Sequence, residues 1–223
     1  MILTLPSYII QGTYLENIRF IDKNYPEITG VELLFFYYDD ETKKLLLDEI
    51  KGINEYSNRF TYTVHLPDNI DDKATEVVEI LDKTADGFIV HPPLDSEKGT
   101  VILKNWINRF GNRFFIENLI SRPAETLSER IENPRLCLDT GHIILNNLSP
   151  LDYYKKYSAK ISEIHLHGVI DGADHRYIST EDSSLLEFSP YLKQFNGIIN
   201  LEMFNQEDVN VSLSTLRNWG IIA

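Results

Sequence analysis

Residues 113–142 read RFFIENLISRPAETLSERIENPRLCLDTGH. The stretch opens with an aromatic and β-branched run that reaches Glu117, and it closes with a second apolar run that reaches Asp139. Between the runs, apolar residues recur at helical spacing after Pro123, which suits the start of a helix because the first turn leaves its N–H groups unpaired. The stretch therefore predicts a strand, a helix and a second strand, with an acidic side chain at the carboxyl end of each strand.

The same alternation of a short strand and an amphipathic helix recurs along the whole chain. The predicted strands are Ile2 to Leu5, Gly30 to Phe36, Phe60 to Leu66, Gly87 to His91, Arg113 to Asn118, Arg135 to Asp139, Glu163 to His167 and Ile198 to Met203. The predicted helices are Tyr14 to Lys23, Glu41 to Tyr56, Lys73 to Ala85, Thr100 to Phe110, Ala124 to Glu132, Leu151 to Ala159, Ser184 to Phe195 and Val209 to Trp219. Eight such units predict an α/β protein, a single (β/α)8 TIM barrel over residues 1–223, with a doubly wound open sheet as the competing arrangement.

The composition suits a single domain with a small-molecule substrate. A chain of 223 residues with 43% hydrophobic content can bury one substantial core. Its formal net charge of −13 repels nucleic-acid phosphates, so we expect no nucleic-acid partner. Divalent cations bound in a carboxylate-lined pocket would reverse the charge locally, so a small anionic substrate remains compatible with this composition.

Cysteine content and hydropathy bear on the compartment. Cys137 is the only cysteine, so no intramolecular disulfide forms, and we expect it in the core of a strand. No apolar run approaches the roughly 20 residues that span a bilayer, and the first residues lack the features of a secretory signal. We expect a soluble, cytoplasmic protein without a membrane partner, and the sequence leaves its oligomeric state open.

The histidines and several carboxylates share one position in the predicted units, at the end of a strand or in the loop just beyond. The carboxyl ends of the strands form the catalytic face of a (β/α)8 barrel, so these side chains are expected to converge. Imidazole and carboxylate are ligands of zinc, manganese and iron. We therefore predict a polynuclear metal site. The residues are His65, His91, His142, His165, His167, His175, Glu117, Asp139 and Glu202.

Two local patterns add detail to the predicted site. Asp139 and His142 form an Asp-x-x-His pair on a Thr-Gly turn, where Gly141 is expected to give the backbone freedom to bring His142 over the barrel mouth. His165 and His167 are two residues apart and therefore share a strand face, so one is expected to bind metal and the other to contact substrate. We assign the substrate contact to His167.

The pieces YTVHLP, FIVHPP, FIENL, CLDTGH, EIHLHG, DHR and NLEMF resemble the xylose isomerase-like TIM barrels, which include sugar isomerases, epimerases and endonuclease IV. The resemblance places the shared metal site of that superfamily at Glu117, Asp139, His165 and Glu202. The endonuclease IV branch adds ligands that correspond to His65, His91, His142 and His175, which implies two or three divalent metal ions, zinc first and manganese or iron as alternatives. The chain departs from that branch at Ala173, and the neighbouring Asp174 is out of register.

A narrower resemblance concerns the substrate. The segments PSYIIQGTYLENIRFI, VELLFFYYDD and YTVHLPD look like those of the bacterial cobamide-remodelling phosphodiesterases. That resemblance implies hydrolysis of the nucleotide loop of a vitamin B12-like cofactor, with Glu117 and Glu202 as the catalytic carboxylates. Arg176 is expected to pair with a phosphate oxygen, unless it is a surface arginine. Tyr37, with Phe36 and Tyr38, is expected to stack on a flat substrate group, unless these rings only cap the barrel.

Two alternatives remain open at this stage. A sugar isomerase or epimerase would need one cation on Glu117, Asp139, His165 and Glu202, while the two glutamates exchange a proton with carbon. It would have no metal for His65 and His91 to bind. A barrel that binds metal or cobamide without turnover is the non-enzymatic alternative. Glu32, an acid inside an apolar run, is either a hydrogen-bonded core carboxylate or a support for the site.

Overall fold

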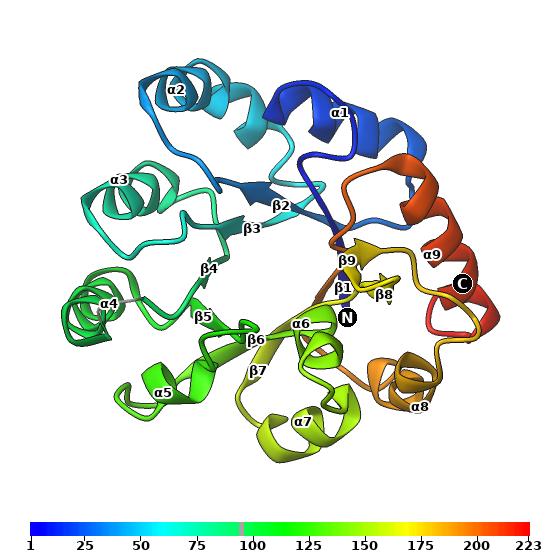
Figure 1. The fold of residues 1–223 in the computed structure, drawn as a ribbon. Helices are drawn as coiled ribbons and strands as arrows, with labels where there is room; N and C mark the ends of the chain where they lie inside the picture. Colours follow the sequence, from blue (N-terminus) through cyan, green and yellow to red (C-terminus); the bar gives the residue numbers. More distant parts are fainter. Residues whose placement is uncertain (94–95) are drawn as a thin grey trace.

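The computed structural model describes residues 1–93 and 96–223, and its centre is a closed barrel of eight parallel strands (Figure 1). The barrel closes because β1 pairs with both β2 and β10, so the predicted (β/α)8 barrel is confirmed and the open sheet is excluded. The barrel strands are β1 (Ile2–Pro6), β2 (Gly30–Leu34), β3 (Thr61–His65), β4 (Gly87–Val90), β5 (Phe114–Glu117), β6 (Arg135–Asp139), β7 (Ile161–His165) and β10 (Ile198–Asn200).

Helices surround the barrel (Figure 1), and several of them begin at a side chain that accepts a hydrogen bond from the first turn. Thr13 and Glu16 form a capping box at the first helix, and Ser149 caps the helix that starts with Pro150. The surrounding helices are α1 (Tyr14–Asn24), α2 (Asp40–Glu55), α3 (Asp72–Leu81), α4 (Ser96–Phe110), α5 (Ala124–Ser128), α7 (Pro150–Tyr157), α8 (Ser183–Leu192) and α9 (Gln206–Asn218).

Two elements at the barrel mouth were not predicted. The helix α6 (Thr140–Leu145) replaces the expected Thr-Gly turn, with Asp139 as its N-cap. A hairpin of β8 (Gly168–Ile170) and β9 (Ala173–Arg176) turns at Asp171 and Gly172, which both have positive φ, as a two-residue hairpin turn requires. The Asp-Gly pair was the sequence signal for this hairpin.

Some predicted boundaries were also wrong. α5 ends at Ser128 rather than Glu132, because the chain turns before Pro134 with Asn133 at a φ of 49°. β7 begins at Ile161 instead of Glu163 and ends at His165. Consequently His167, like His91 and Glu202, lies just beyond a strand in the loops of the barrel mouth.

The barrel interior consists of layers set by the two-residue period of the strands. Cys137 is buried as expected, in a small apolar cluster with Ile89, Phe115 and Ile198. A hydrogen-bonded polar group lies beside this cluster, since Cys137 pairs with Glu163; the polar group contains Thr4, Glu32, Thr63, Glu163 and Asn200. Six predicted ligands lie two residues beyond members of these two groups: His91, Glu117 and Asp139 beyond the apolar cluster, and His65, His165 and Glu202 beyond the polar group.

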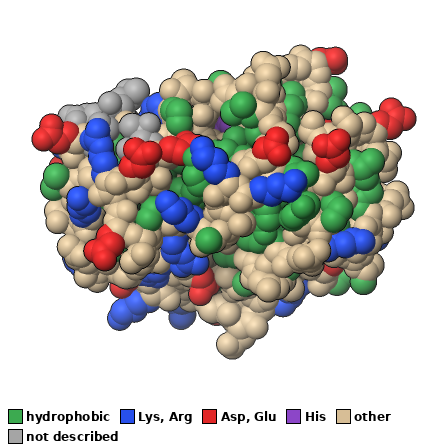
Figure 2. All heavy atoms as spheres, turned by 90° about the horizontal axis from the view of Figure 1, so that it is seen from below, with side chains coloured by type: hydrophobic (Ala, Val, Ile, Leu, Met, Phe, Trp, Pro, Cys, Tyr) green, Lys and Arg blue, Asp and Glu red, His purple; other side chains and the backbone are tan. Residues whose placement is uncertain are grey.

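The main hydrophobic core lies between the strands and the surrounding helices, where residues such as Leu5, Val64 and Leu138 are fully buried. The outer face in Figure 2 shows acidic and basic side chains interspersed, with hydrophobic side chains gathered in the right half, on the side where α7 and α8 lie in Figure 1. In residues 1–93 and 96–223, no helix combines the length and the apolarity needed to cross a membrane.

The first prediction concerns the cap of α3. The Asp71 side chain accepts hydrogen bonds from the backbone N–H groups of Lys73 and Ala74, at 2.9 and 3.1 Å. Asp71→Ala removes this acceptor and should lower the free energy of unfolding by about 1 kcal/mol. Asp71→Asn keeps an acceptor and is the matched control. Urea unfolding measures both variants, and equal stability of the two would contradict the assigned cap.

Candidate metal centre

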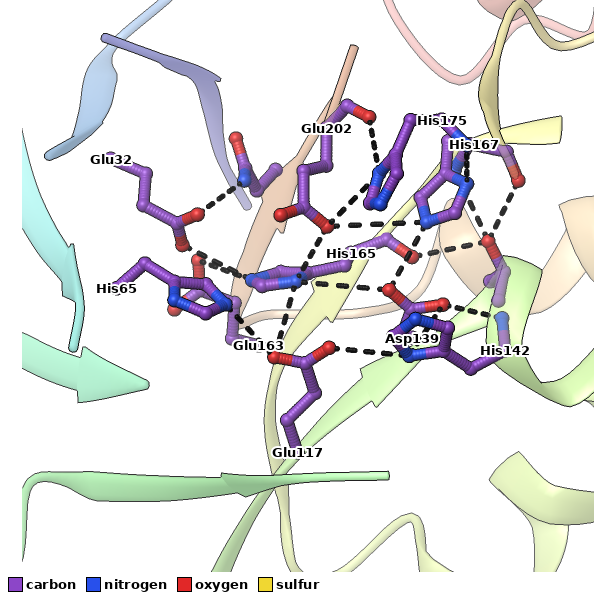
Figure 3. Close-up of polar contacts among 12 residues, drawn as sticks. Glu32, His65, Glu117, Asp139, His142, Glu163, His165, His167, His175 and Glu202 are labelled. Atoms are coloured by element: carbon purple, nitrogen blue, oxygen red, sulfur yellow. Dashed lines mark hydrogen bonds and ion pairs between the residues drawn. The ribbon is translucent and has the colours of Figure 1, made fainter. Parts of the chain in front are cut away.

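The structure brings all eight predicted metal ligands to the carboxyl end of the barrel, as Figure 3 shows for most of them. Most of these side chains are buried, and His91, His142 and His175 keep partial exposure. They come from six barrel strands or the loops beyond them, from α6 and from β9. The set is His65, His91, Glu117, Asp139, His142, His165, His175 and Glu202.

The carboxylate of Glu117 lies at the centre of the cluster. Its Oε2 atom is 3.2 Å from His65 Nε2 and 3.3 Å from His91 Nε2. The same oxygen is 3.8 Å from His165 Nδ1, and Oε1 is 3.4 Å from His142 Nδ1. Burial raises the pKa of Glu117, but the neighbouring His91 and His165 outweigh it and hold the pKa well below its usual range. Glu117 is therefore an anionic group that faces several imidazoles.

Each of the five predicted histidine ligands has one ring nitrogen engaged with a protein acceptor. His65 Nδ1 donates to the Leu66 carbonyl at 3.1 Å, and His91 Nδ1 donates to Asp68 Oδ1 at 2.9 Å. The remaining donors are His142 Nδ1 to the Asn118 carbonyl at 2.9 Å, His165 Nε2 to Glu32 at 3.1 Å and His175 Nδ1 to the Glu202 carbonyl at 3.2 Å. In a metal-bound form, such contacts would fix the tautomer and leave the second nitrogen as a lone-pair donor, the arrangement found around metal-bound histidines.

Two atoms in the buried part of the site lack hydrogen bonds. His165 Nδ1 and Glu202 Oε2 are 2.9 Å apart, yet neither has a hydrogen-bond partner among the described residues. Burial raises the pKa of Glu202, but His165 and His175 outweigh it, so the group is an anion. An unpaired buried nitrogen and an unpaired buried carboxylate oxygen are costly alone, whereas both suit a shared cation. The residues present therefore fit a metal ion.

The ligand atoms form more than one group with metal-binding spacing. His65, His91 and Glu117 make one group, and His65, His165 and Glu202 make another. A further group contains His142, Asp174 and His175, where His142 Nε2 is 3.8 Å and His175 Nε2 is 4.0 Å from the Asp174 carboxylate. The sequence suggested that Asp174 is out of register, but the hairpin places it beside both histidines. The described residues therefore offer several overlapping candidate groups for a metal ion.

His167 does not contact the cavity, so its predicted role as a substrate contact is wrong. The side chain is fully buried, and His167 Nδ1 accepts a hydrogen bond from the His175 backbone N–H at 2.9 Å. Nε2 therefore carries the proton and donates to Asp139 Oδ2 at 3.1 Å. A Cβ atom on Gly141 would collide with this ring, so Gly141 is needed for close packing, and its predicted role in backbone freedom is not supported. His167 orients Asp139.

Arg176 is not at the site, and Arg122 is. The Nε of Arg176 donates to Asp208 Oδ2 on α9 at 3.2 Å, which matches the surface interpretation and removes the predicted phosphate contact. Arg122 lines the cavity above the ligands, together with Asp68, His91 and Glu117. Its Nη1 donates to the Pro92 carbonyl at 2.7 Å. Neither Arg122 nor Asp68 was selected from the sequence, although both lie next to the motifs that carry the ligands.

The cavity above the ligands has a volume of about 500 Å³, and aromatic residues border it. Tyr37 lines it with 86% of its surface exposed, and Phe36 lines it with its ring 4.8 Å from the His65 ring. Tyr38 is buried and packs on Phe35, so only the first two of the three predicted aromatic residues reach the cavity. The cavity is the place where a substrate would meet the ligands.

A buried carboxyl pair supports the site from below. Glu32 accepts from His165 Nε2 at 3.1 Å and from Asn200 Nδ2 at 3.0 Å, which favours its interpretation as a support for the site. Burial and the Glu32 carboxylate raise the pKa of the neighbouring Glu163 well above its usual range, so Glu163 is neutral. Glu32 is thus the acceptor that fixes the tautomer of His165.

No protein-family model and no curated protein sequence matches the chain, but solved structures do. It is similar to the IolI protein in a structure with a bound zinc atom, with 15% identity over 99% of this chain and 97% of that chain and a TM-score of 0.67. The endonuclease IV of Thermus thermophilus is 14% identical over 98% of each chain, with a TM-score of 0.62. The 3-keto-D-glucoside 4-epimerase YcjR of E. coli is 13% identical over 100% of each chain, with a TM-score of 0.65. The chain shares the (β/α)8 barrel fold of these proteins.

Identities this low establish the barrel fold and not the activity. Several of the similar proteins are enzymes by name, and they include an epimerase, sugar phosphate isomerases/epimerases and an endonuclease. Those names support the isomerase or epimerase alternative better than they support a cobamide phosphodiesterase. The choice of reaction therefore depends on the geometry of the site.

The second prediction concerns the protons that are released when a metal ion binds. Burial lowers the pKa of His91, but Glu117 and Asp68 outweigh it and raise it to about 9. For His142, Asp139 and Glu117 outweigh burial and raise the pKa to about 10. In the metal-free barrel both imidazoles are therefore protonated at neutral pH, and a metal ion has to displace these protons. Zinc affinity should rise as the pH increases toward 9.

Titration calorimetry near pH 7 in two buffers of different ionisation enthalpy measures the released protons, and zinc binding without proton release would contradict the assignment. The raised pKa values of His91 and His142 also stabilise the folded metal-free protein. This stabilisation is fully present at pH values below about 6.5, the pKa of histidine in the unfolded chain. This contribution is lost as the pH rises through about 9.

The third prediction compares the contributions of Glu32 and Glu163 to metal affinity. Glu32→Gln replaces the carboxyl group that accepts from His165 and should weaken zinc binding by about 10- to 100-fold. Glu163→Gln replaces a carboxyl that is already neutral, so it is the matched control and should retain most of the affinity. Competition with a chromophoric chelator measures both, and circular dichroism checks the fold. Equal affinities of the two variants would show that Glu32 does not support the site.

Proposed function

We propose that this barrel is a metal-dependent hydrolase of a small phosphate ester, with two or three divalent cations, most readily zinc and alternatively manganese or iron. The convergence of His65 and His91 on Glu117 carries the proposal. These histidines form a ligand group beyond the single-cation set of Glu117, Asp139, His165 and Glu202. A one-metal isomerase has no use for this group, whereas phosphate-ester hydrolysis uses more than one cation.

The predicted ligands have different places in the proposed metal centre. Glu117 lies between the His65–His91 pair and His165, so its carboxylate would be a ligand in either of the two groups. Glu202 Oε2 lies 2.9 Å from His165 Nδ1 and belongs to the same ligand group. Asp174 belongs to a further ligand group with His142 and His175. When bound, divalent cations supply Lewis acidity, an activated water and neutralisation of charge on the leaving oxygen.

Arg122 provides the positive charge that the sequence assigned to Arg176. It lines the same cavity as His91 and Glu117 and is the candidate to pair with a phosphate oxygen. Its hydrogen bond to the Pro92 carbonyl occupies only one of the five guanidinium N–H donors. A bound phosphate would therefore lie between Arg122 and the metal ligands, which supports an ester of phosphate as the substrate class.

A sugar isomerase or epimerase is the second candidate, because it has the same fold as several of the similar enzymes. Glu117 and Glu202 would then exchange a proton with a substrate carbon while one cation holds adjacent oxygens. His142 would contact the substrate. Under this mechanism, loss of His91 should have little effect on turnover.

The more specific proposal is a cobamide, cleaved at its nucleotide loop. It is supported by the sequence motifs at residues 6–21, 31–40 and 62–68 and by the aromatic border of the cavity. The accompanying proposals are a small-molecule partner, no nucleic-acid or membrane partner, and a cytoplasmic location.

The fourth prediction is that the zinc-loaded protein cleaves a cobamide and leaves a panel of ketoses unchanged, with products identified by mass. His91→Ala should lower this activity by more than about 100-fold, a larger loss than removal of a supporting residue causes. Glu202→Gln should abolish it. Metal content by mass spectrometry should exceed one ion per chain and should fall in His91→Ala.

Other results would decide against parts of the proposal. Conversion of a ketose with full activity in His91→Ala establishes the isomerase instead. Cleavage of simple phosphodiesters without cleavage of a cobamide keeps the hydrolase and removes the cobamide. Saturation at one ion per chain contradicts the polynuclear centre, and a normal cellular phenotype in Glu202→Gln favours a binding protein without turnover.

A further inference from the structure

A second cavity of about 500 Å³ lies beside the metal centre. Its walls come from the loop after β1, the start of α1, the end of β2, α2 and the loop after β10. Aromatic and aliphatic side chains dominate the walls, and none of the described lining residues carries a charge. The residues that matter most are Tyr8, Tyr14, Phe36, Tyr37, Leu45 and Phe204.

This cavity is continuous with the metal centre. Phe36 and Tyr37 line both cavities. The Phe36 ring is 4.8 Å from the His65 ring, and the Phe204 ring is 4.8 Å from the His175 ring. The two phenylalanine rings meet edge to face at 6.1 Å, so together they form a wall with metal-ligand histidines on one side and the second cavity on the other.

Most polar groups of the cavity wall are already used by the protein. Ser7 Oγ accepts from the Leu34 N–H at 3.1 Å, and Tyr14 OH donates to the Leu34 carbonyl at 3.2 Å. Thr13 Oγ1 donates to Glu49 and Thr42 Oγ1 donates to Asp39, at 2.5 and 2.9 Å. The other hydroxyl groups of the wall belong to the exposed Tyr8 and Tyr37. The wall therefore offers few partners for the several hydroxyl groups of a sugar and favours an apolar ring.

The aromatic side chains at this rim are unusually exposed for their size. Tyr8 is 55% exposed and Tyr37 is 86% exposed, and Phe36 keeps 39%. Tyr8 meets Phe204 edge to face at 6.5 Å, which leaves ring edges and faces available to a further ring. Exposed apolar surface next to a reaction centre is typical of a ligand-binding groove.

We propose that the second cavity binds an uncharged, flat aromatic group of the substrate while the phosphate ester lies at the metal centre. This inference rests on the proposed hydrolase function and narrows its substrate class to phosphodiesters with an aromatic substituent. The aromatic group packs between the rings of Tyr8, Phe36 and Phe204, and it positions the ester beside His65 and His175. Simple alkyl phosphodiesters and sugar phosphates lack this contact.

The fifth prediction compares two probes with the same non-aromatic leaving group, benzyl trifluoroethyl phosphate and methyl trifluoroethyl phosphate, on the zinc-loaded full chain, with released trifluoroethanol followed by fluorine NMR. The benzyl ester should have the higher kcat/KM. Leu45→Glu puts a charge into the cavity and should lower the benzyl-to-methyl ratio by about tenfold. Leu47→Glu is the matched control, because Leu47 lies on the same helix with 51% of its surface exposed, and it should keep the ratio.

A second variant and a binding measurement complete the test. Tyr8→Ala changes an exposed side chain, so it should fold normally and should also lower the ratio. Saturation-transfer NMR with indole reports binding of a neutral flat ring without any reaction. Indole should bind to the wild type and to Leu47→Glu, and its signal should fall in Leu45→Glu and Tyr8→Ala.

The outcomes separate this inference from the proposed function. A lower ratio and weaker indole binding in both cavity variants support the aromatic site. Indole binding that depends on Leu45 and Tyr8, without cleavage of either ester, supports the site and removes the hydrolase. Cleavage of both esters with the wild-type ratio in every variant, and no indole binding, overturns the aromatic site and keeps the hydrolase.

Discussion

The Glu117 carboxylate is buried at the mouth of the barrel, where ring nitrogens of four histidines surround it at 3.2 to 3.8 Å. A buried carboxylate costs several kcal/mol unless charges or cations compensate for it. In the metal-free protein, protonated His91 and His142 provide that compensation. Metal ions would replace these protons without any change in the residues that surround Glu117. The Glu117 carboxylate therefore binds protonated histidines in the metal-free protein, and the same carboxylate would be a ligand for cations.

The rest of the site depends on how each imidazole is held. Glu32 binds His165 from the layer below, and the Asn118 carbonyl binds His142 from the end of β5. Asp139 caps α6 through Oδ1 and accepts from His167 through Oδ2, so a helix start and a metal ligand share one carboxylate. The direction of every free ring nitrogen follows from these contacts. The second cavity shares this framework, since its phenylalanine wall packs against His65 and His175.

Most of the fold could be predicted because both faces of a barrel strand are constrained. The outward residues pack on helices, and the inward residues form layers at a two-residue period. The stretches FFIEN and LCLD therefore indicated both a strand and the direction of Glu117 and Asp139. The helix at Thr140–Leu145 was missed because it is short and starts from a side chain that was interpreted only as a ligand. The hairpin that carries His175 was missed because its strands lie outside the barrel.

By itself, the sequence determined that the protein is an α/β barrel and that histidines and carboxylates gather at the carboxyl ends of its strands. The reason is that the spacing of apolar residues within each segment, and the order of the segments along the chain, can both be read directly from the sequence. Only the tertiary structure decided which nitrogen of each histidine is free, because that depends on acceptors such as Glu32 and Asp68 that are distant in sequence. It also showed that Arg176 and His167 do not line the cavity, that Arg122 lines it, and that Asp174 lies beside His142 and His175. Side-chain direction in loops and hairpins depends on packing partners, and no spacing along the chain specifies those partners.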